Sequence, residues 1–267
     1  MKRVTMLGAV LAVVMAGGAR AAVVGKAVEY KEGGKTLEGF LAYDDAVKGP
    51  RPGVMLVHEW RGMNDYVRGR ARQVAALGYV AFAADIYGKG VYAKDHEEAG
   101  KMAGMYRNDR ARMRARAHAG LEALKKQPNV DVTRLAAIGY CFGGTTVLEM
   151  ARAGEDLRGV VSFHGALDTP TPAVKGAVKA KVLICQGGAD AFTLKSLPDL
   201  EKEMDDAGVD WQVNIYSGAV HSFTVPDAGN DPAKGMAYNA AADHRSWEAL
   251  EEFLEEVFGI TDADEKK

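Results

Sequence analysis

Short apolar runs alternate with amphipathic stretches over most of the chain. Runs of this kind, bounded by turn residues, are typical of buried parallel strands. Ahead of them, two segments that flank Gly33-Gly34-Lys35 predict an antiparallel hairpin at the edge of a sheet. The pattern therefore predicts eight strands, at residues 28–30, 37–43, 53–58, 80–84, 135–138, 160–163, 182–185 and 213–216.

Segments with helical periodicity separate or follow these strands. Alternation of the two kinds of element predicts an α/β fold, with a mostly parallel sheet of about eight strands and helices on both faces. No Pro/Ser-rich linker interrupts the alternation, so residues 22–267 are expected to form a single domain. The second helical segment should break near Asn108; the five segments lie at residues 65–77, 97–125, 143–153, 197–207 and 236–258.

The first residues carry the pattern of a secretory signal peptide. Lys2 and Arg3 precede an apolar stretch at residues 4–15, and the small-residue triplet Ala19-Arg20-Ala21 follows. We expect residues 1–21 to be removed and the mature protein to be exported, to the periplasm or outside the cell; an uncleaved anchor is the alternative. Nothing later in the chain approaches the roughly 20 consecutive apolar residues of a membrane-spanning helix, so the mature chain should contain none.

Charge and composition argue against several classes of partner. A net charge of −2 and a pI near 6.3 give no electrostatic case for nucleic acid. No H-E-x-x-H motif, paired Cys or His spacing, or acidic calcium loop is present, so neither a metal nor another cofactor is predicted. Oligomeric state has no signal in the sequence. One basic cluster lacks interleaved aromatics and is expected to be a solvated helix face; it comprises the arginines at 107, 110, 112, 114 and 116.

The strongest chemical signal is the heptapeptide Gly-Tyr-Cys-Phe-Gly-Gly-Thr at residues 139–145. It follows an apolar run and places Cys141 at a strand-to-helix turn, as in the nucleophile elbow G-x-[S/C]-x-G. Glycines flank the central residue because the turn is strained and side chains there would collide with the backbone. The next helix begins at once, so the amide of Phe142 and the positive helix end favour negative charge beside the sulfur. The chain is therefore predicted to be an acyl-transfer enzyme.

Other reactive residues also follow predicted strands. Carboxyl ends of parallel strands meet at one edge of the sheet, where ligands bind. The order nucleophile, acid, histidine, which is found in hydrolases, selects Cys141, Asp190 and His221. His164 is the rival base, but it precedes the acid in the chain. The set at this edge is His58, Glu59, Asp85, Cys141, His164, Asp190 and His221.

On these motifs the chain resembles the dienelactone hydrolase family of α/β-hydrolases. The resemblance extends from about residue 54 to residue 258 and implies the α/β-hydrolase fold and hydrolysis of a carboxylic ester or lactone. It also implies that Cys141 is the nucleophile, His221 the general base and Asp190 the acid that orients it. The motifs that carry it lie at residues 57–62, 85–88, 139–144, 187–190 and 220–223.

The same resemblance implies three further roles. The amides of Phe142 and Trp60 would form the oxyanion hole, and Glu59 would hold the resting thiol and help to create the thiolate. A carboxylate beside a thiol can accept the S–H proton, although Glu59 could instead pair with Arg61 or cap a helix near Asn64.

Substrate identity is less well defined. Founding members carry an arginine shortly after the histidine that clamps the dienelactone carboxylate, whereas this chain has Thr224 and Val225 there. A small ester or lactone is therefore expected, with Trp60, Tyr140 and Phe223 lining an apolar pocket unless they fill the core. The alternatives are a short acyl-ester or thioester hydrolase, and a non-catalytic exported binding protein on the same scaffold.

The second cysteine, Cys185, ends an apolar run on a different predicted strand from Cys141. Export would permit a disulfide, but the two positions disagree with pairing. Both cysteines are therefore expected to be free thiols, with Cys185 acting as a small buried hydrophobe.

Overall fold

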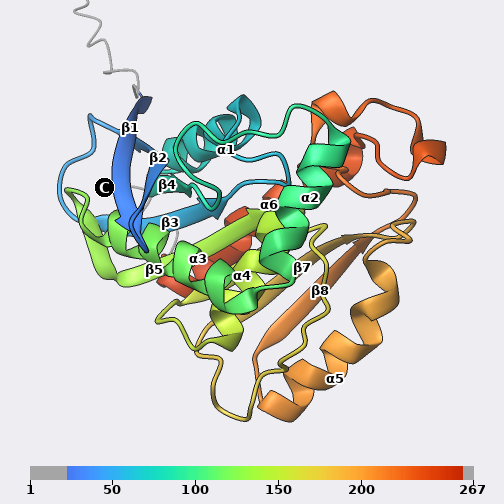
Figure 1. Cartoon of the computed structure of the whole chain (residues 1–267). Coiled ribbons are helices and arrows are strands. Elements are labelled where there is room, and N and C mark those ends of the chain that lie inside the picture. The colour runs from blue at the N-terminus through green and yellow to red at the C-terminus, as the bar shows by residue number, and fades with distance from the viewer. Residues whose placement is uncertain (1–22, 261–267) are drawn as a thin grey trace, which may run out of the picture.

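A single eight-stranded sheet forms the centre of the computed structural model, which describes residues 23–260 (Figure 1). Strand order across the sheet is β1-β2-β4-β3-β5-β6-β7-β8. The bounds in chain order are β1 (Val23–Glu32), β2 (Lys35–Asp44), β3 (Arg51–Val57), β4 (Val80–Ala84), β5 (Val130–Tyr140), β6 (Gly159–Phe163), β7 (Lys181–Gly187) and β8 (Trp211–Tyr216).

Strand direction follows the expected pattern. The hairpin β1–β2 is antiparallel and lies at one edge, β2 pairs with β4 in antiparallel register, and every other pairing is parallel. The predicted fold class and the eight strands are thus confirmed. The predicted signal peptide at residues 1–21 lies outside the described residues, and export remains a prediction.

Helices cover both faces of the sheet. Residues of α1 and α6 pack into one apolar cluster, and residues of α2, α3, α4 and α5 pack into the other. Figure 1 shows α3 and α4 in front of the sheet and α6 behind it. The bounds are α1 (Asp65–Ala76), α2 (His96–Arg107), α3 (Arg110–Lys125), α4 (Phe142–Arg152), α5 (Leu197–Ala207) and α6 (Ala240–Phe258).

Of two helix boundaries predicted from the sequence pattern, one is confirmed and one is wrong. The break predicted near Asn108 is confirmed, because α2 ends there and the side chain of Asp109 accepts from the Arg112 amide at the start of α3. The last helix does not begin at Met236 as predicted. Residue 236 instead forms an isolated bridge with His221, and the Asn239 side chain starts α6 by capping the amide of Ala242.

The prediction that the arginine cluster forms a solvated helix face is also wrong. Arg116 is buried and ion-paired with Glu32, and Arg114 pairs with the fully buried Glu149. Arg112 alone of these three is exposed, its guanidinium over the Tyr106 ring. The arginines therefore hold the helix against neighbouring elements, because a guanidinium can bury its stem and still reach a carboxylate.

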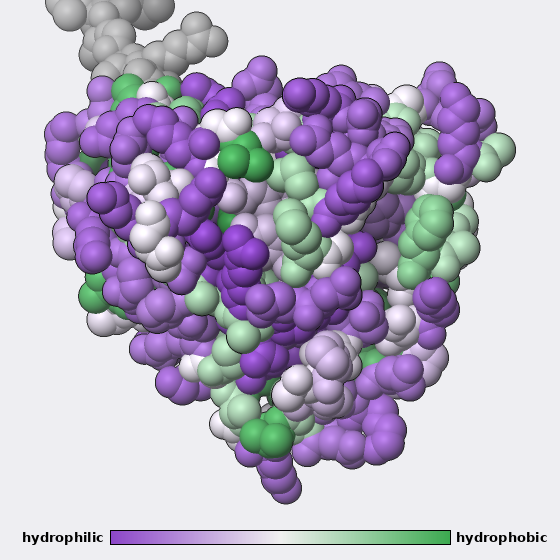
Figure 2. All heavy atoms as spheres, viewed as in Figure 1, coloured by the Kyte–Doolittle hydropathy of each residue, from purple (hydrophilic) through white to green (hydrophobic). Residues whose placement is uncertain are grey.

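The visible face of the molecule is largely hydrophilic, with apolar residues in small separate groups (Figure 2). Among the described residues, no helix combines the length and apolarity that crossing a bilayer requires.

The turn at Cys141 depends on close backbone approach between β5, α4 and β3. A Cβ at Gly139 would lie 2.1 Å from the Gly143 carbonyl oxygen, and a Cβ at Gly143 would lie 2.2 Å from the Val57 carbonyl oxygen. Backbone atoms cannot move aside as a flexible side chain can. Both glycines are therefore sterically required.

We predict that Gly143→Ala destabilises the protein by about 1–3 kcal/mol, because the methyl group must push α4 away from β3. Gly100→Ala, at an exposed position of α2, is the matched control: its Cβ meets nothing within 4 Å and it should stabilise by about 0.5–1 kcal/mol. Urea denaturation followed by circular dichroism measures both. Similar stability changes in the two variants would contradict the steric account.

Candidate active site

Cys141 lies in a strained turn between β5 and α4. Its φ of 54° and ψ of −113° place a non-glycine residue in a sparsely populated region, at a cost of roughly 1–3 kcal/mol. Two hydrogen bonds hold the turn: the Cys141 amide donates to the Phe163 carbonyl at 3.0 Å, and the Thr145 amide donates to the Cys141 carbonyl at 3.2 Å. The sulfur is thereby fixed at the N-terminal end of α4.

Three of the predicted residues form a continuous line. Nε2 of His221 lies 3.1 Å from Cys141 Sγ, and Nδ1 lies 2.9 Å from Asp190 Oδ2. The other Asp190 oxygen accepts from the amides of Phe192 and Thr193 at 2.9 and 3.3 Å. Thus both carboxylate oxygens are engaged, and one of them orients the imidazole.

The surroundings of His221 favour its charged form. Burial by itself would lower its pKa, but negative charge on the Cys141 sulfur and the hydrogen bond to Asp190 raise the pKa to about 10. His221 would therefore be protonated at neutral pH. A protonated Nε2 can donate a hydrogen bond to Sγ across the 3.1 Å between them.

Glu59 is buried beside this line but does not contact the sulfur through a hydrogen bond; within the described part of the chain, His221 is the hydrogen-bond partner of Sγ. Burial raises the pKa of Glu59 to about 7, against the opposing effect of the positive charges of His221, Arg70 and Arg61. In the described residues no ion pair joins Glu59 to Arg61, whose guanidinium donates to the Lys94 carbonyl, and the side chain that caps α1 is that of Asn64.

A cleft of about 440 Å³ opens next to Glu59. Aromatic rings, charged groups and small residues share its wall, so its character is mixed rather than apolar. We call it the Glu59 cleft; it is lined by Glu59, Trp60, Arg61, Asn64, Tyr66, Tyr92, His96, Ser222, Val225, Asp227, Ala228, Lys234 and Met236.

Of the three aromatic residues predicted to line a pocket, only Trp60 reaches this cleft. Tyr140 is fully buried, stacked on Phe163, and Phe223 is fully buried with its ring against Tyr216. The prediction for Tyr140 and Phe223 is corrected on this point. Each ring lies in the apolar cluster on the face of the sheet that α1 and α6 cover.

His164, the rival base, packs against His221 and makes no hydrogen bond to the thiol in the described residues. Its ring meets that of His221 edge-on at 5.2 Å, and its Nε2 lies 2.8 Å from the Thr224 hydroxyl. Burial holds the pKa of His164 well below its ordinary value, and the charge of His221 lowers it further. A neutral imidazole there avoids repulsion between two adjacent cations.

Arg70 of α1 is the residue at this site that the sequence analysis missed. It donates to the Thr224 carbonyl at 2.9 Å and forms a buried ion pair with Asp243 of α6. Tyr66 completes the connection, because its hydroxyl lies 2.6 Å from the Thr224 hydroxyl. The loop that carries His221 is thus tied to two helices. An arginine on the apolar stripe of α1 is the sequence signal that could have revealed it.

No group of three or more His, Cys, Asp or Glu side chains in residues 23–260 is arranged to hold a metal ion. Both cysteines are free and buried, as predicted, and burial raises the pKa of Cys185 to about 12.

A thiol elbow after β5, an acid after β7 and a histidine after β8 define the site of an α/β-hydrolase. The family model for the dienelactone hydrolase family matches residues 37–258. The chain belongs to this family and is a carboxylic ester hydrolase of the dienelactone hydrolase type.

The chain is also similar to individual proteins. Protein usf of Aquifex pyrophilus is 30% identical over 206 residues, which cover 75% of this chain and 87% of the relative. The solved structure called m3DLH is 40% identical with a TM-score of 0.85, covering 89% of this chain and 99% of its own. A dienelactone hydrolase-like promiscuous phosphotriesterase from metagenomic libraries is 39% identical with a TM-score of 0.82 and the same coverage.

We predict that Arg70→Met lowers the free energy of unfolding by about 3–5 kcal/mol, because Asp243 is left without its buried partner. Arg68→Met in the same helix is the control: Arg68 makes only an exposed ion pair with Asp65, and its loss should cost less than about 1 kcal/mol. Chemical denaturation compares the two. Equal costs would show that the Arg70 ion pair contributes no more than a surface pair.

A second prediction concerns pH and Glu59. Because its pKa rises from an ordinary 4.5 to about 7 on folding, the folded state keeps a proton that the unfolded state releases over this window. Stability from this group is complete below pH 4.5 and is lost as pH rises towards 7, on the order of 3 kcal/mol in all. Unfolding free energies of the wild type and Glu59→Gln should therefore diverge over this window, with the wild type losing more. Parallel curves would contradict the raised pKa.

Proposed function

We propose that the protein hydrolyses a small carboxylic ester or lactone through a covalent acyl-enzyme on Cys141. The observation that carries this proposal is the line from Sγ through the His221 ring to Asp190, with both contacts within about 3 Å. Such a line activates a nucleophile and returns its proton to the leaving group.

The reaction begins with attack of the Cys141 thiolate on the carbonyl carbon. The negative charge that develops on the carbonyl oxygen is accepted by the amides of Phe142 and Trp60. As the intermediate collapses, the C–O bond to the leaving group breaks, and His221 donates its Nε2 proton to the departing oxygen. A thioester to Cys141 remains. When the substrate is a lactone, the alcohol that forms stays attached to the acyl group of this thioester.

Hydrolysis of the thioester restores the enzyme. Neutral His221 takes a proton from water, and the hydroxide attacks the thioester carbon at the same oxyanion site. Sulfur leaves as thiolate, and the carboxylic acid product departs after transfer of its proton to solvent. Asp190 stays ionised throughout and keeps the imidazole in the required orientation.

Glu59 regulates the charge of this site in the proposed mechanism. It makes no hydrogen bond to the sulfur, but its interaction with the His221 charge is attractive. Ionised Glu59 therefore stabilises the imidazolium, and neutral Glu59 does not. This effect replaces the direct contact with the resting thiol that the family resemblance implies.

The Glu59 cleft suits a small polar ester or lactone. Thr224 and Val225 stand where the founding members carry an arginine shortly after the histidine, and Thr224 is buried against Tyr66 and His164. Arg61 and Lys234 line the cleft singly, among aromatic rings and an aspartate. The proposed substrate is therefore selected by size and by the position of its carbonyl, with no bidentate grip on a carboxylate.

A second candidate activity is hydrolysis of phosphotriesters. The relative with that promiscuous activity shares 39% of its residues with this chain at a TM-score of 0.82. A soft thiolate can attack phosphorus, breaking the bond to an aryloxide that leaves with the His221 proton, and the two amides can stabilise negative charge on the phosphoryl oxygen as on a carbonyl oxygen. We propose this as a side activity of the same Cys141 site.

We predict that Cys141→Ala lowers the rate of 4-nitrophenyl acetate hydrolysis by at least about 10³-fold, because the nucleophile is lost. Cys185→Ala is the matched control, since it removes the other buried thiol; activity should stay within about twofold. Initial rates measured with both purified variants decide the point. Full activity of Cys141→Ala would exclude the acyl-enzyme.

A substrate panel distinguishes the proposed hydrolase from its two alternatives, a thioester hydrolase and a non-catalytic binding protein. Lactones, acyl thioesters, aryl esters and an aryl phosphotriester are compared by kcat/KM, and we expect lactones or small esters to exceed thioesters by tenfold or more, equal to about 1.4 kcal/mol. Thioester preference would favour the alternative hydrolase. Binding of panel compounds without turnover, together with a Cys141 that iodoacetamide does not modify, would favour the non-catalytic binding protein.

A further inference from the structure

His58 is a fully buried histidine directly before Glu59, and it lies outside the line from Cys141 through His221 to Asp190. Its Nδ1 lies 2.6 Å from the Glu59 carbonyl oxygen, and its Nε2 accepts the Ile86 amide at 3.2 Å. A carbonyl oxygen can only accept and an amide can only donate. The two contacts therefore require the neutral tautomer with the proton on Nδ1.

The bond to the Glu59 carbonyl determines where the Trp60 amide points. The carbonyl of residue 59 and the N–H of residue 60 belong to one planar trans peptide, in which the two groups point in opposite directions. His58 and the Gly62 amide, at 3.2 Å, both donate to the Glu59 oxygen. Rotation of this peptide would break both bonds, so the Trp60 N–H is held on the opposite side.

The following peptide is fixed in the same way. The Tyr87 hydroxyl donates to the Trp60 carbonyl at 2.9 Å, so both peptides that flank residue 60 are held by side chains, the first by His58 and the second by Tyr87. Tyr87 also meets the His58 ring edge-on at 4.8 Å. His58 and Tyr87 thus support each other as well as the loop.

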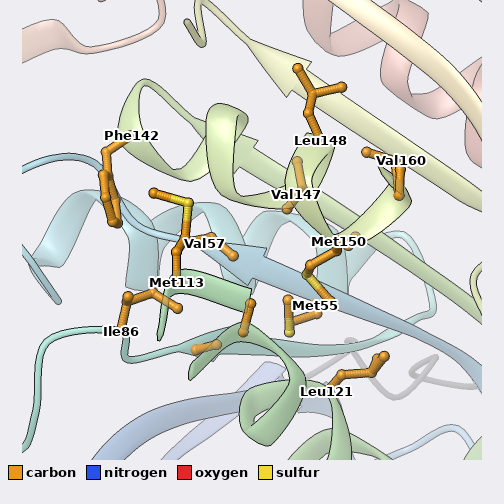
Figure 3. Packing of buried hydrophobic residues seen from close by; sticks show 14 of the residues in the cluster. Met55, Val57, Ile86, Met113, Leu121, Phe142, Val147, Leu148, Met150 and Val160 are labelled. Carbon is orange, nitrogen blue, oxygen red and sulfur yellow. The ribbon is translucent and has the colours of Figure 1, made fainter. Parts of the chain in front are cut away.

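His58 also contacts the other half of the proposed oxyanion hole. Its ring is stacked on Phe142, with centroids 6.0 Å apart and planes 15° apart. Figure 3 shows the Phe142 side chain directed into the apolar cluster that contains Val57, Ile86 and Met113. The Phe142 ring is therefore anchored in the core, while its amide opens α4. One imidazole touches both segments that supply an amide.

Neutrality of His58 agrees with this arrangement. Burial lowers its pKa, against the raising effect of Asp85 and the bond to the Glu59 carbonyl. Within the described residues, neither the Trp60 amide nor the Phe142 amide donates to a backbone carbonyl, so both remain free for a substrate oxygen.

We propose that His58, assisted by Tyr87, is a positioning residue that sets the Trp60 amide against the Phe142 amide and so preforms the oxyanion hole. This inference rests on the proposed acyl-transfer function. Neither side chain touches the substrate; each acts through the direction of a peptide group. Preorganised amides need no reorientation when charge develops on the substrate oxygen.

The experiment compares two reactions of Cys141 in the same variants. Hydrolysis of 4-nitrophenyl acetate passes through an oxyanion, whereas alkylation of the thiolate by iodoacetamide does not. We expect Tyr87→Phe to lower kcat by about tenfold and His58→Phe by about 10²-fold, because misplacing one donor costs this much. The alkylation rate should stay within about twofold, and KM should change less than kcat.

Two further variants control for packing. Tyr106→Phe removes a hydroxyl from a ring that stacks on Tyr87, and it should leave kcat unchanged. His58→Asn can still donate near the Nδ1 position, so it should recover part of the activity lost in His58→Phe. Thermal unfolding checks that each variant is folded; Tyr87→Phe keeps the ring packing and provides the test if His58→Phe does not fold.

Unchanged kcat in Tyr87→Phe, and in His58→Phe where it folds, would overturn the proposal. So would an equal fall in hydrolysis and alkylation, since this would place the damage at the thiol and not at the oxyanion hole. Failure of the underlying function looks different: the wild type would keep its esterase activity after complete alkylation of Cys141.

Discussion

Close contact between the backbones of β5, α4 and β3 is the constraint on which the site depends. Only glycine at positions 139 and 143 allows α4 to start against the end of β3. This contact forces Cys141 into a strained conformation and holds its sulfur at the helix N-terminus. The strain is maintained because strands on both sides of β5 over-determine the turn.

Charges around this turn are buried and therefore interdependent. His221 is kept cationic by the sulfur and Asp190, His164 behind it is neutral, and Glu59 has a pKa near 7. In water these groups would titrate almost independently. In the low-dielectric surroundings of the site, the protonation of one residue changes the pKa of its neighbours. The protonation states of these residues are therefore coupled.

Positioning in this enzyme works through the backbone as much as through side chains. Arg70 holds the histidine loop by the Thr224 carbonyl, and His58 and Tyr87 hold the loop after β3 by the carbonyls of Glu59 and Trp60. Arg70 belongs to α1, whereas His58 and Tyr87 lie just beyond the ends of β3 and β4; each of these side chains fixes the direction of a peptide. Loops that carry catalytic groups thereby acquire the rigidity of the helices and strands around them.

The sequence by itself determined the eight strands and the break at Asn108, because hydrophobic periodicity is a local property. It also determined the elbow, through the steric need for glycine, and the three residues that the structure brings into line, because the ends of parallel strands meet at one edge of the sheet. It did not determine which way a side chain points once its strand ends. Tyr140 and Phe223 therefore lie in the core instead of the cleft, and in the described residues no hydrogen bond joins Glu59 to the thiol. The roles of Arg70 and His58 were likewise decided only by the tertiary structure, since their partners are distant in the chain or depend on the orientation of a single peptide.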